Sequence, residues 1–259
     1  MTAVASAEPR MLPAGPGRRF AGDQIVRSGD VLPSGRVRLD ALARYLQDVA
    51  NDDGIDAAID AELAWVVRRT TMRLHRRPRY HQELGLVTWA SAAGSRWAER
   101  RTTIRAGDEV AVEAAAVWVC VDLATLRPAR LSERFWQMYG EATGGRTVSS
   151  RLLHHGPAAD VVPARSWPLR LADFDVFDHV NNAATWVAVE DELARVAPGG
   201  RVEWAEVEYR TPIERSTDVV IASRLEGPLA RVWLLAGGAV LASATARLAP
   251  GPEGRDGLT

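Results

Sequence analysis

The sequence predicts an α+β fold in which two central helices are backed by one long antiparallel sheet. Three observations lead to this prediction. The chain carries the same order of segments twice, each half contains one long stretch of helical period, and the later segments of each half have the short apolar runs and turn residues of strands. A helix followed by a four-strand meander buries its apolar face by lying in a curled sheet, and a duplicated unit places two such sheets edge to edge.

The first half contains the elements in the order β-α-β-β-β-β. QIVRSGDVLPSG (24–35) leads into the helical stretch RLDALARYLQDVAN (38–51), and AWVVRRTTMRLHRRP (64–78) and LGLVTWASA (84–92) follow as strands. Residues 95–122 then form a hairpin with a glycine at its centre. The apolar face of the helix has the three- and four-residue spacing of an amphipathic helix: Leu39, Leu42, Ala43, Leu46 and Val49.

The second half repeats this order. SWPLRLADFDVFD (166–178) leads into the helical stretch HVNNAATWVAVEDELARV (179–196), which is apolar almost all round and is expected to be buried on several sides. The strands RVEWAEVEYRTP (201–212) and DVVIASRLE (218–226) and the hairpin at 229–248 follow. The segment after each helix ends on Arg-x-Pro, at Arg76/Pro78 and at Arg210/Pro212.

The repeat sets the expected domain boundaries. We expect a disordered tail at 1–19, a first domain at 20–136, a linker at 137–163, a second domain at 164–249 and a tail at 250–259. The linker prediction depends on the turn-forming stretches GEATGGR and HHGPAAD, which lack strand or helix periodicity.

Composition excludes several classes of function. The formal net charge of −1 gives no overall attraction to nucleic acid or anionic lipid. No apolar run reaches the length of a membrane span, and the first residues lack a signal peptide's apolar core, so we expect a cytoplasmic protein. The five histidines show no metal-ligand spacing, and no dinucleotide or phosphate-loop motif occurs, so neither a metal nor another cofactor is expected. The single cysteine, Cys120, lies in an apolar strand and is expected in the core.

The one concentration of positive charge lies between Arg68 and Arg79. All the basic residues of the chain are arginine, and six of them fall within this stretch. A solvated strand and turn is the simpler interpretation. The alternative hypothesis is a docking surface for an acidic carrier protein or for the phosphates of CoA.

The stretch DVFDHVNN (175–182) gathers an acid, a histidine and two asparagines before the second helix. Asn181 or Asn182 is a natural N-cap residue, and the free N–H groups of the first turn favour negative charge. If these N–H groups hold a carbonyl oxygen, Asp175 beside it could activate water or attack directly, and His179 could orient or polarise the substrate. The structural interpretation is a capped helix with a supporting aspartate in the turn.

The first half differs chemically at this place. In GDVLPSGRVRLD (29–40), Asp30 is retained, but the histidine and asparagines are missing and Ser34–Gly35 stand in the aligned region. We therefore expect one half to keep a site and the other to keep only the fold.

The repeat and the DVFDHVNN stretch together resemble the acyl-acyl-carrier-protein thioesterases, which have a double hot-dog fold. The likeness covers about residues 20–248 and includes RLDALARYLQDVAND, WVVRRTTM, the EYR strand and VWVCVDLATLRPARL. It implies hydrolysis of a fatty acyl thioester of acyl carrier protein or CoA, in fatty acid biosynthesis or lipid metabolism, by Asp175 and His179. Asn181 and Asn182 are expected to bind the substrate.

The sequence departs from the plant-type pattern D-x-N-x-H, because Phe177 stands at its asparagine. Pro212 stands at the position of a downstream glutamate, and Thr185 replaces a tyrosine in the helix. Two alternatives therefore stay open: a hot-dog protein that binds acyl thioesters without turnover, and a hot-dog hydratase or dehydratase. Because one chain supplies both units, a monomer is expected to suffice, although exposed sheet edges could form a homodimer.

Overall fold

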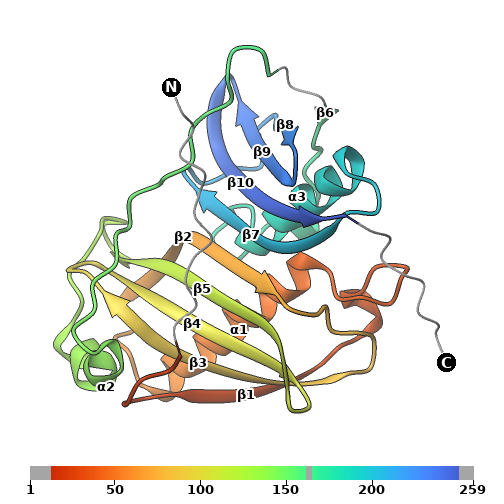
Figure 1. Ribbon diagram of the computed structural model, residues 1–259. Coiled ribbons are helices and arrows are strands. Elements are labelled where there is room, and N and C mark those ends of the chain that lie inside the picture. The colour runs from red at the N-terminus through yellow and green to blue at the C-terminus, as the bar shows by residue number, and fades with distance from the viewer. Residues whose placement is uncertain (1–12, 162–164, 251–259) are drawn as a thin grey trace.

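The computed structural model describes residues 13–161 and 165–250, and its core is one antiparallel sheet of ten strands. The first half supplies β1 (Phe20–Ile25), α1 (Leu39–Asp56), β2 (Leu63–Leu74), β3 (Glu83–Ala93), β4 (Trp97–Ala106) and β5 (Glu109–Asp122). The second half supplies β6 (Arg165–Ser166), α3 (Asn182–Val196), β7 (Arg201–Tyr209), β8 (Val220–Glu226), β9 (Leu229–Ala236) and β10 (Ala239–Ala249). The predicted β-α-β-β-β-β order is confirmed in both halves (Figure 1).

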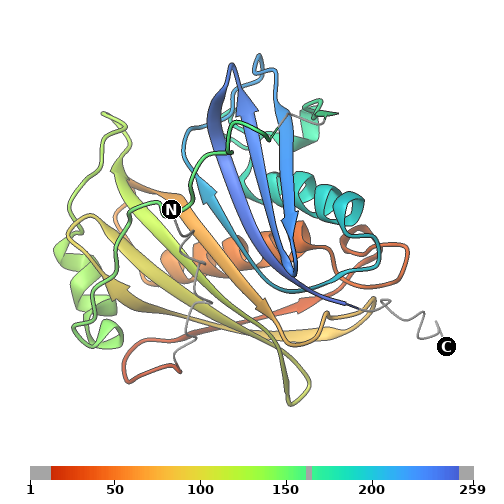
Figure 2. The ribbon, with the colours of Figure 1, turned by 45° about the horizontal axis from the view of Figure 1, so that its top comes forward.

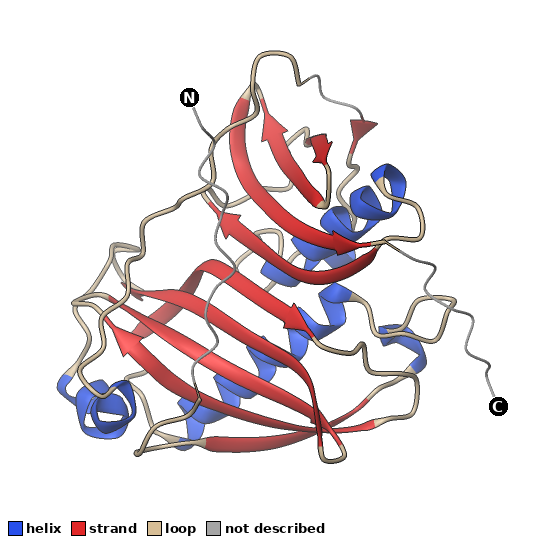
Figure 3. Cartoon of the chain, in the orientation of Figure 1, coloured by secondary structure: helices blue, strands red, loops and turns tan. Residues whose placement is uncertain are grey.

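The sheet is symmetric about the junction between β2 and β7. Its strand order is β1-β3-β4-β5-β2-β7-β10-β9-β8-β6, so each half has the same internal order and the two halves meet through their first strand after the helix. At this junction Thr71 pairs with Glu206. The units thus lie edge to edge, and the predicted architecture of two central helices backed by a long antiparallel sheet is confirmed (Figure 3).

Matched hydrogen bonds show which residues of the two halves correspond. Pro78 and Ile213 correspond, because each accepts a backbone bond from the residue after its half's turn. Thr71 lies as many residues before Pro78 as Glu206 lies before Ile213. Thr71 and Glu206, which pair across the junction, are therefore also each other's counterparts. An approximate two-fold axis therefore passes between them. The matched bonds are Val37 N–H to Pro78 O with Val180 N–H to Ile213 O, and His75 and Arg76 N–H to Ala111 O with Arg210 and Thr211 N–H to Leu241 O.

Helices α1 and α3 lie side by side against one face of the sheet and bury the main core (Figure 2). Apolar side chains of both helices and of the strands join in a single cluster, so the two halves share one core instead of each having its own. Fully buried members from the two helices include Leu39, Leu42, Trp186, Ala188 and Val189.

A third helix, α2 (Glu133–Thr143), was not expected from the sequence. It begins at Ser132, whose hydroxyl accepts from Phe135 N–H, and it buries Phe135 and Tyr139 against the far end of the first half's sheet. The predicted linker 137–163 therefore starts inside a helix. After α2 the chain crosses to the second half, held by the indole N–H of Trp97 on Val148 O and of Trp233 on His155 O.

The predicted tails are only partly testable, because residues 1–12 and 251–259 lie outside the described residues. Residues 13–19, the described part of the predicted N-terminal tail, contact the first half. Arg18 forms an ion pair with the buried Asp53 at 2.8 Å, and Gly17 packs so closely on Ala142 that a β-carbon would clash with its backbone. Among the helices that the structure describes, none combines the length and apolarity needed to cross a membrane.

Candidate active site

Asp175 and His179 face each other across a tight turn. The Asp175 N–H donates to His179 O at 2.9 Å, and Phe174 and Val180 form the β-bridge just outside this pair. The turn residues are 176–178, and Asp178 takes the left-handed conformation with φ of 61°. Aspartate tolerates this conformation better than most residues. The two residues are therefore cross-strand neighbours, whose side chains leave the same face of the turn.

The Asp175 carboxylate is held in place by the turn. Its Oδ1 accepts from Phe177 N–H at 2.9 Å and from His179 N–H at 3.4 Å. Its Oδ2 makes no hydrogen bond to any residue that the structure describes. The carboxylate thus supports the turn, as the structural interpretation requires, and also keeps one oxygen for a substrate or water.

The tip of the turn is apolar and faces solvent. Val176 is 94% exposed and Phe177 is 61% exposed. Phe177, at the asparagine position of the plant-type pattern, therefore does not pack in the core. The turn is anchored from the other side by Arg215, which pairs with Asp178 and lies 4.6 Å over the ring of Phe174.

Helix α3 begins directly after this turn, with one N–H left open. Asn181 is the N-cap, and its side-chain oxygen accepts from Ala183 N–H at 2.8 Å, while its backbone oxygen accepts from Ala184 N–H. Within the described parts of the chain, the Asn182 N–H has no hydrogen-bond acceptor. Asn181 is therefore engaged in capping, and Asn182 supplies the donor that a carbonyl oxygen could use.

Tyr209, at the end of β7, holds the start of α3 in place through hydrogen bonds of its hydroxyl group. Its hydroxyl donates to Asn182 O at 3.2 Å and accepts from the indole N–H of Trp186 at 2.9 Å. Burial raises the pKa of Tyr209 above its usual value, so the hydroxyl stays protonated and can donate this bond. The EYR strand is recognisable in the sequence, but this role of Tyr209 was not predicted. The signal available was a tyrosine on the inward face of a strand next to the helix.

The first half has the same turn with different chemistry. Leu32 N–H donates to Arg36 O, and Gly35 takes the left-handed position, so Leu32 and Arg36 are the counterparts of Asp175 and His179. Asp30, which the sequence suggested as the retained acid, is instead the counterpart of Asp173, and both cap a short 3-10 turn through the same backbone contact. The predicted alignment of Asp30 with Asp175 was therefore wrong by two residues.

The start of α1 is also closed. Leu39 N–H, the counterpart of Asn182 N–H, donates to the carboxylate of Glu190 at 2.8 Å. Arg77 pairs with the other oxygen of Glu190 at 2.5 Å, and the Arg77 side chain is only 6% exposed. An acceptor-only carboxylate therefore uses the N–H whose counterpart in the second half, that of Asn182, has no acceptor among the described residues.

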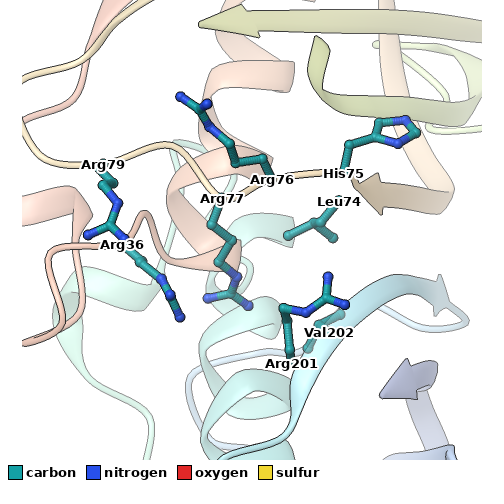
Figure 4. Close-up of a pocket in the computed structure, with 8 residues that line it drawn as sticks. All are labelled: Arg36, Leu74, His75, Arg76, Arg77, Arg79, Arg201 and Val202. Atoms are coloured by element: carbon teal, nitrogen blue, oxygen red, sulfur yellow. The ribbon is translucent and has the colours of Figure 1, made fainter. Parts of the chain in front are cut away.

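Beside this closed end lies a cavity of about 450 Å³ lined mainly by arginine (Figure 4). Its lining has no acidic residue and consists of Arg36, Leu74, His75, Arg76, Arg77, Arg79, Arg201 and Val202. Several of these side chains pair with carboxylates behind the lining, such as Arg76 with Glu109. The arginines of the 68–79 stretch thus do not form one patch, because Arg68 donates to Tyr209 O and Arg210 O in the second half.

One group of metal-type ligands occurs in the described residues, and the sequence spacing had not revealed it. His154, from the linker, lies 3.2 Å from Glu206, and both carboxylates of Glu206 and Glu208 are buried. The two negative charges already face two guanidinium groups, Arg69 at 3.8 Å and Arg210 at 3.6 Å. Glu208 also accepts the backbone N–H groups of Leu153 and His154. Because the negative charges are already balanced, the arrangement favours an ion-pair network that holds the linker rather than a site for a divalent cation.

Cys120 is buried in β5, as predicted, and burial raises the pKa of its thiol. A protonated, inaccessible thiol is a poor nucleophile.

Comparison with known proteins gives the same family in both halves. Residues 17–139 match the model of the acyl-ACP thioesterase N-terminal domain, and residues 159–233 match that of the C-terminal domain. An uncharacterized protein of Mycobacterium tuberculosis, found in two strains, is 29% identical over 217 residues, which cover 82% of this chain and 85% of that protein.

Solved structures share the fold over nearly the whole chain. A putative oleoyl thioesterase from Lactobacillus plantarum has a TM-score of 0.76 at 16% identity and covers 91% of this chain and 98% of its own. The 12:0-ACP thioesterase from Umbellularia californica has a TM-score of 0.74 at 19% identity, with coverage of 90% and 98%. An acyl-ACP thioesterase from Bacteroides thetaiotaomicron has a TM-score of 0.73 at 16% identity, with coverage of 89% and 98%.

These likenesses show the double hot-dog fold, and the two family models together span most of the chain. The chain belongs to the acyl-ACP thioesterase family.

Proposed function

We propose that this protein hydrolyses a fatty acyl thioester to a free fatty acid and a thiol, at the site formed by Asp175, His179 and Asn182. The observation that carries the proposal is the open Asn182 N–H at the start of α3, directly after the turn that presents Asp175 and His179. The equivalent N–H of the first half is closed by Glu190, so the proposal places the acid and the histidine that act on the thioester in the second half.

The residues suggest a simple course for the reaction. The thioester carbonyl accepts from the Asn182 N–H, and Asp175 takes a proton from water as its oxygen bonds to the carbonyl carbon. The tetrahedral species then expels the thiolate, which takes up a proton as the C–S bond breaks. His179, beside Asp175, orients the acyl group or shuttles this proton. The products are one carboxylic acid and one thiol for each water consumed.

Acyl carrier protein is the carrier that the family favours, and CoA is the alternative. The matching family models describe acyl-ACP thioesterases, and two of the similar solved structures carry that activity in their names. On this proposal the protein acts in fatty acid metabolism in the cytoplasm, and needs neither a metal nor another cofactor.

Thiol release from a panel of acyl-ACP and acyl-CoA substrates tests the proposal. We expect Asp175→Asn and His179→Ala to lower kcat by about 100-fold or more, because each removes a group acting on the reacting atoms. Asp178→Asn, in the same turn, is the matched control and should stay near wild type. Circular dichroism and Tm verify folding of all three variants.

The alternatives give different results in the same panel. A protein that only binds would retain acyl thioesters without releasing thiol. A hydratase would consume enoyl substrates while the thioester stays intact. Thiol release that survives in both site variants would place the chemistry elsewhere.

A further inference from the structure

The two-fold relation assigns a further residue to the site, and that residue comes from the first half. Glu190 is the ninth residue of α3 and reaches the first residue of α1, Leu39, with its carboxylate 2.8 Å from the Leu39 N–H. The ninth residue of α1 is Gln47. Because Leu39 and Asn182 are counterparts, the same relation that joins Glu190 to the start of α1 brings Gln47 to the start of α3.

The side chains in these two places differ in hydrogen-bonding capacity. A carboxylate only accepts, so Glu190 uses up the Leu39 N–H and closes that helix end. A carboxamide carries two donor hydrogens on its nitrogen. Gln47 is half-buried, and neither its side chain nor the Asn182 N–H has a hydrogen-bond partner among the described residues. The second half thus keeps two donors at a place where the first half keeps a closed donor–acceptor pair.

We propose that the Gln47 carboxamide and the Asn182 N–H bind the substrate carbonyl oxygen together and hold the negative charge that develops on it. This inference rests on the proposed function, because it names the second donor to the thioester carbonyl. The catalytic site is then shared: Asp175 and His179 come from the second half, and Gln47 comes from the central helix of the first. A duplicated chain without turnover in its first half would still need that half for the reaction.

Glutamate at position 47 is the sharpest test, since it recreates the closed end found at α1. In Gln47→Glu, the new carboxylate should accept the Asn182 N–H as Glu190 accepts that of Leu39. We expect kcat to fall by about 100-fold or more, as when an oxyanion donor is lost. We expect Tm to stay equal or to rise, because a helix start gains an acceptor. Gln47→Ala should lower kcat without the gain in Tm.

A glutamine on another helix provides the control. Gln137 lies on α2, where its exposed side chain donates a hydrogen bond to Glu133 at 3.4 Å. Gln137→Glu adds the same charge to the chain and should leave kcat within two-fold of wild type. A fall in kcat equal to that of Gln47→Glu would mean that added negative charge, and not the lost donor, disturbs the enzyme.

Binding separates this inference from the proposed function. An acyl-pantetheine analogue with a methylene in place of the thioester sulfur keeps the carbonyl and cannot be hydrolysed. We expect Gln47→Glu to raise its Kd about ten-fold, even if wild type releases no thiol from any substrate. In that case the proposed hydrolysis would be wrong, while the contact between Gln47 and the carbonyl oxygen would be supported. If kcat and this Kd both stay within two-fold of wild type in Gln47→Glu, the assignment of Gln47 is overturned.

Discussion

The two halves of this chain share a backbone and differ at one corner of it. In both, a three-residue turn with a left-handed third residue leads into a central helix, and matched backbone bonds tie the residue after the turn's closing pair to the segment that follows the next strand. The first half places Leu32 and Arg36 in that turn and closes the helix start with Glu190. The second half places Asp175 and His179 there and leaves the helix start open.

This comparison teaches that the fold alone does not make the site. The duplicated turn and helix supply the same geometry twice, and the side chains decide which helix start has its first N–H occupied by a carboxylate. The closed copy has a structural role of its own, because its Glu190–Arg77 pair joins α3 to α1 and to the segment after β2. Four variants sharpen this comparison, beginning with the largest expected effect and ending with the smallest.

Removing Glu190 should cost the most stability. Glu190→Ala opens the start of α1 and leaves the Arg77 guanidinium buried without its partner, so we expect a loss of about 3–5 kcal/mol in the free energy of unfolding. Urea denaturation measures it. Glu190→Gln, which can still accept one bond, should cost less. If Glu190→Ala has the same free energy of unfolding as wild type, the contact of Glu190 with the start of α1 does not stabilise the fold. The structural role given to the closed end would then be wrong.

Tyr209 supports the open end, and Tyr209→Phe should show it. The variant keeps the ring and loses the bonds to Asn182 O and Trp186 Nε1, for an expected cost of about 1–2 kcal/mol in stability. We also expect kcat to fall several-fold with little change in KM, because the Asn182 N–H is no longer held in place. The first-half counterpart is Leu74, so Leu74→Met serves as a volume-preserving control with unchanged kcat. A purely structural tyrosine would lower Tm and leave kcat alone.

The repeated order of elements could be predicted from the sequence because each element repeats its own periodicity and turn residues. The Gly-centred hairpins and the N-cap role of an asparagine follow from local patterns, and the structure has Asn181 in that role. The helix limits were predicted less well, because α1 runs on to Asp56, beyond the predicted end at residue 51. Helix α2 was not predicted because its apolar residues pack on strands distant in the sequence. The second half has no corresponding segment, so comparing the two halves could not reveal it.

The site was harder to predict than the fold. DVFDHVNN is contiguous, so its acid and histidine could be named, although their catalytic roles stay predictions. The alignment of Asp30 failed because a β-turn can shift a short motif by two residues without changing the flanking pattern. Glu190 and Gln47 act on residues of the other half, and the pairing of β2 with β7 joins the two halves. Tyr209 acts within its own half, on a helix start 27 residues away in the chain.

The junction itself offers a pH test, because the two counterparts Thr71 and Glu206 are hydrogen bonded at 2.6 Å. Burial alone would raise the pKa of the Glu206 carboxyl, but contacts from His154 and Thr71, with the charges of His154 and Arg69, bring it below the usual 4.5. A lowered pKa in the folded state stabilises the fold above about pH 4.5, and this contribution is lost as the pH falls further.

Glu206→Gln should therefore be less stable than wild type at pH 7, by about 1–3 kcal/mol, and lose less stability between pH 5 and pH 3.5. Tm measured across this range checks both statements. Glu203→Gln, on the same strand but partly exposed, is the control and should follow the wild-type profile. Parallel profiles for wild type and Glu206→Gln would contradict the assignment.

The smallest effect is expected at the arginine-lined cavity beside the closed start of α1. The sequence raised the hypothesis that this stretch docks an acidic carrier, but the cavity lies at the closed end, on the far side of the two-fold axis from α3's open start. Arg76 is half exposed and paired with Glu109, so Arg76→Glu should change stability by less than about 1 kcal/mol. We expect it to leave KM for acyl-ACP within two-fold of wild type at low and moderate salt. A salt-dependent rise in KM for acyl-ACP, without one for acyl-pantetheine, would show that the carrier contacts both halves and that the closed copy serves recognition.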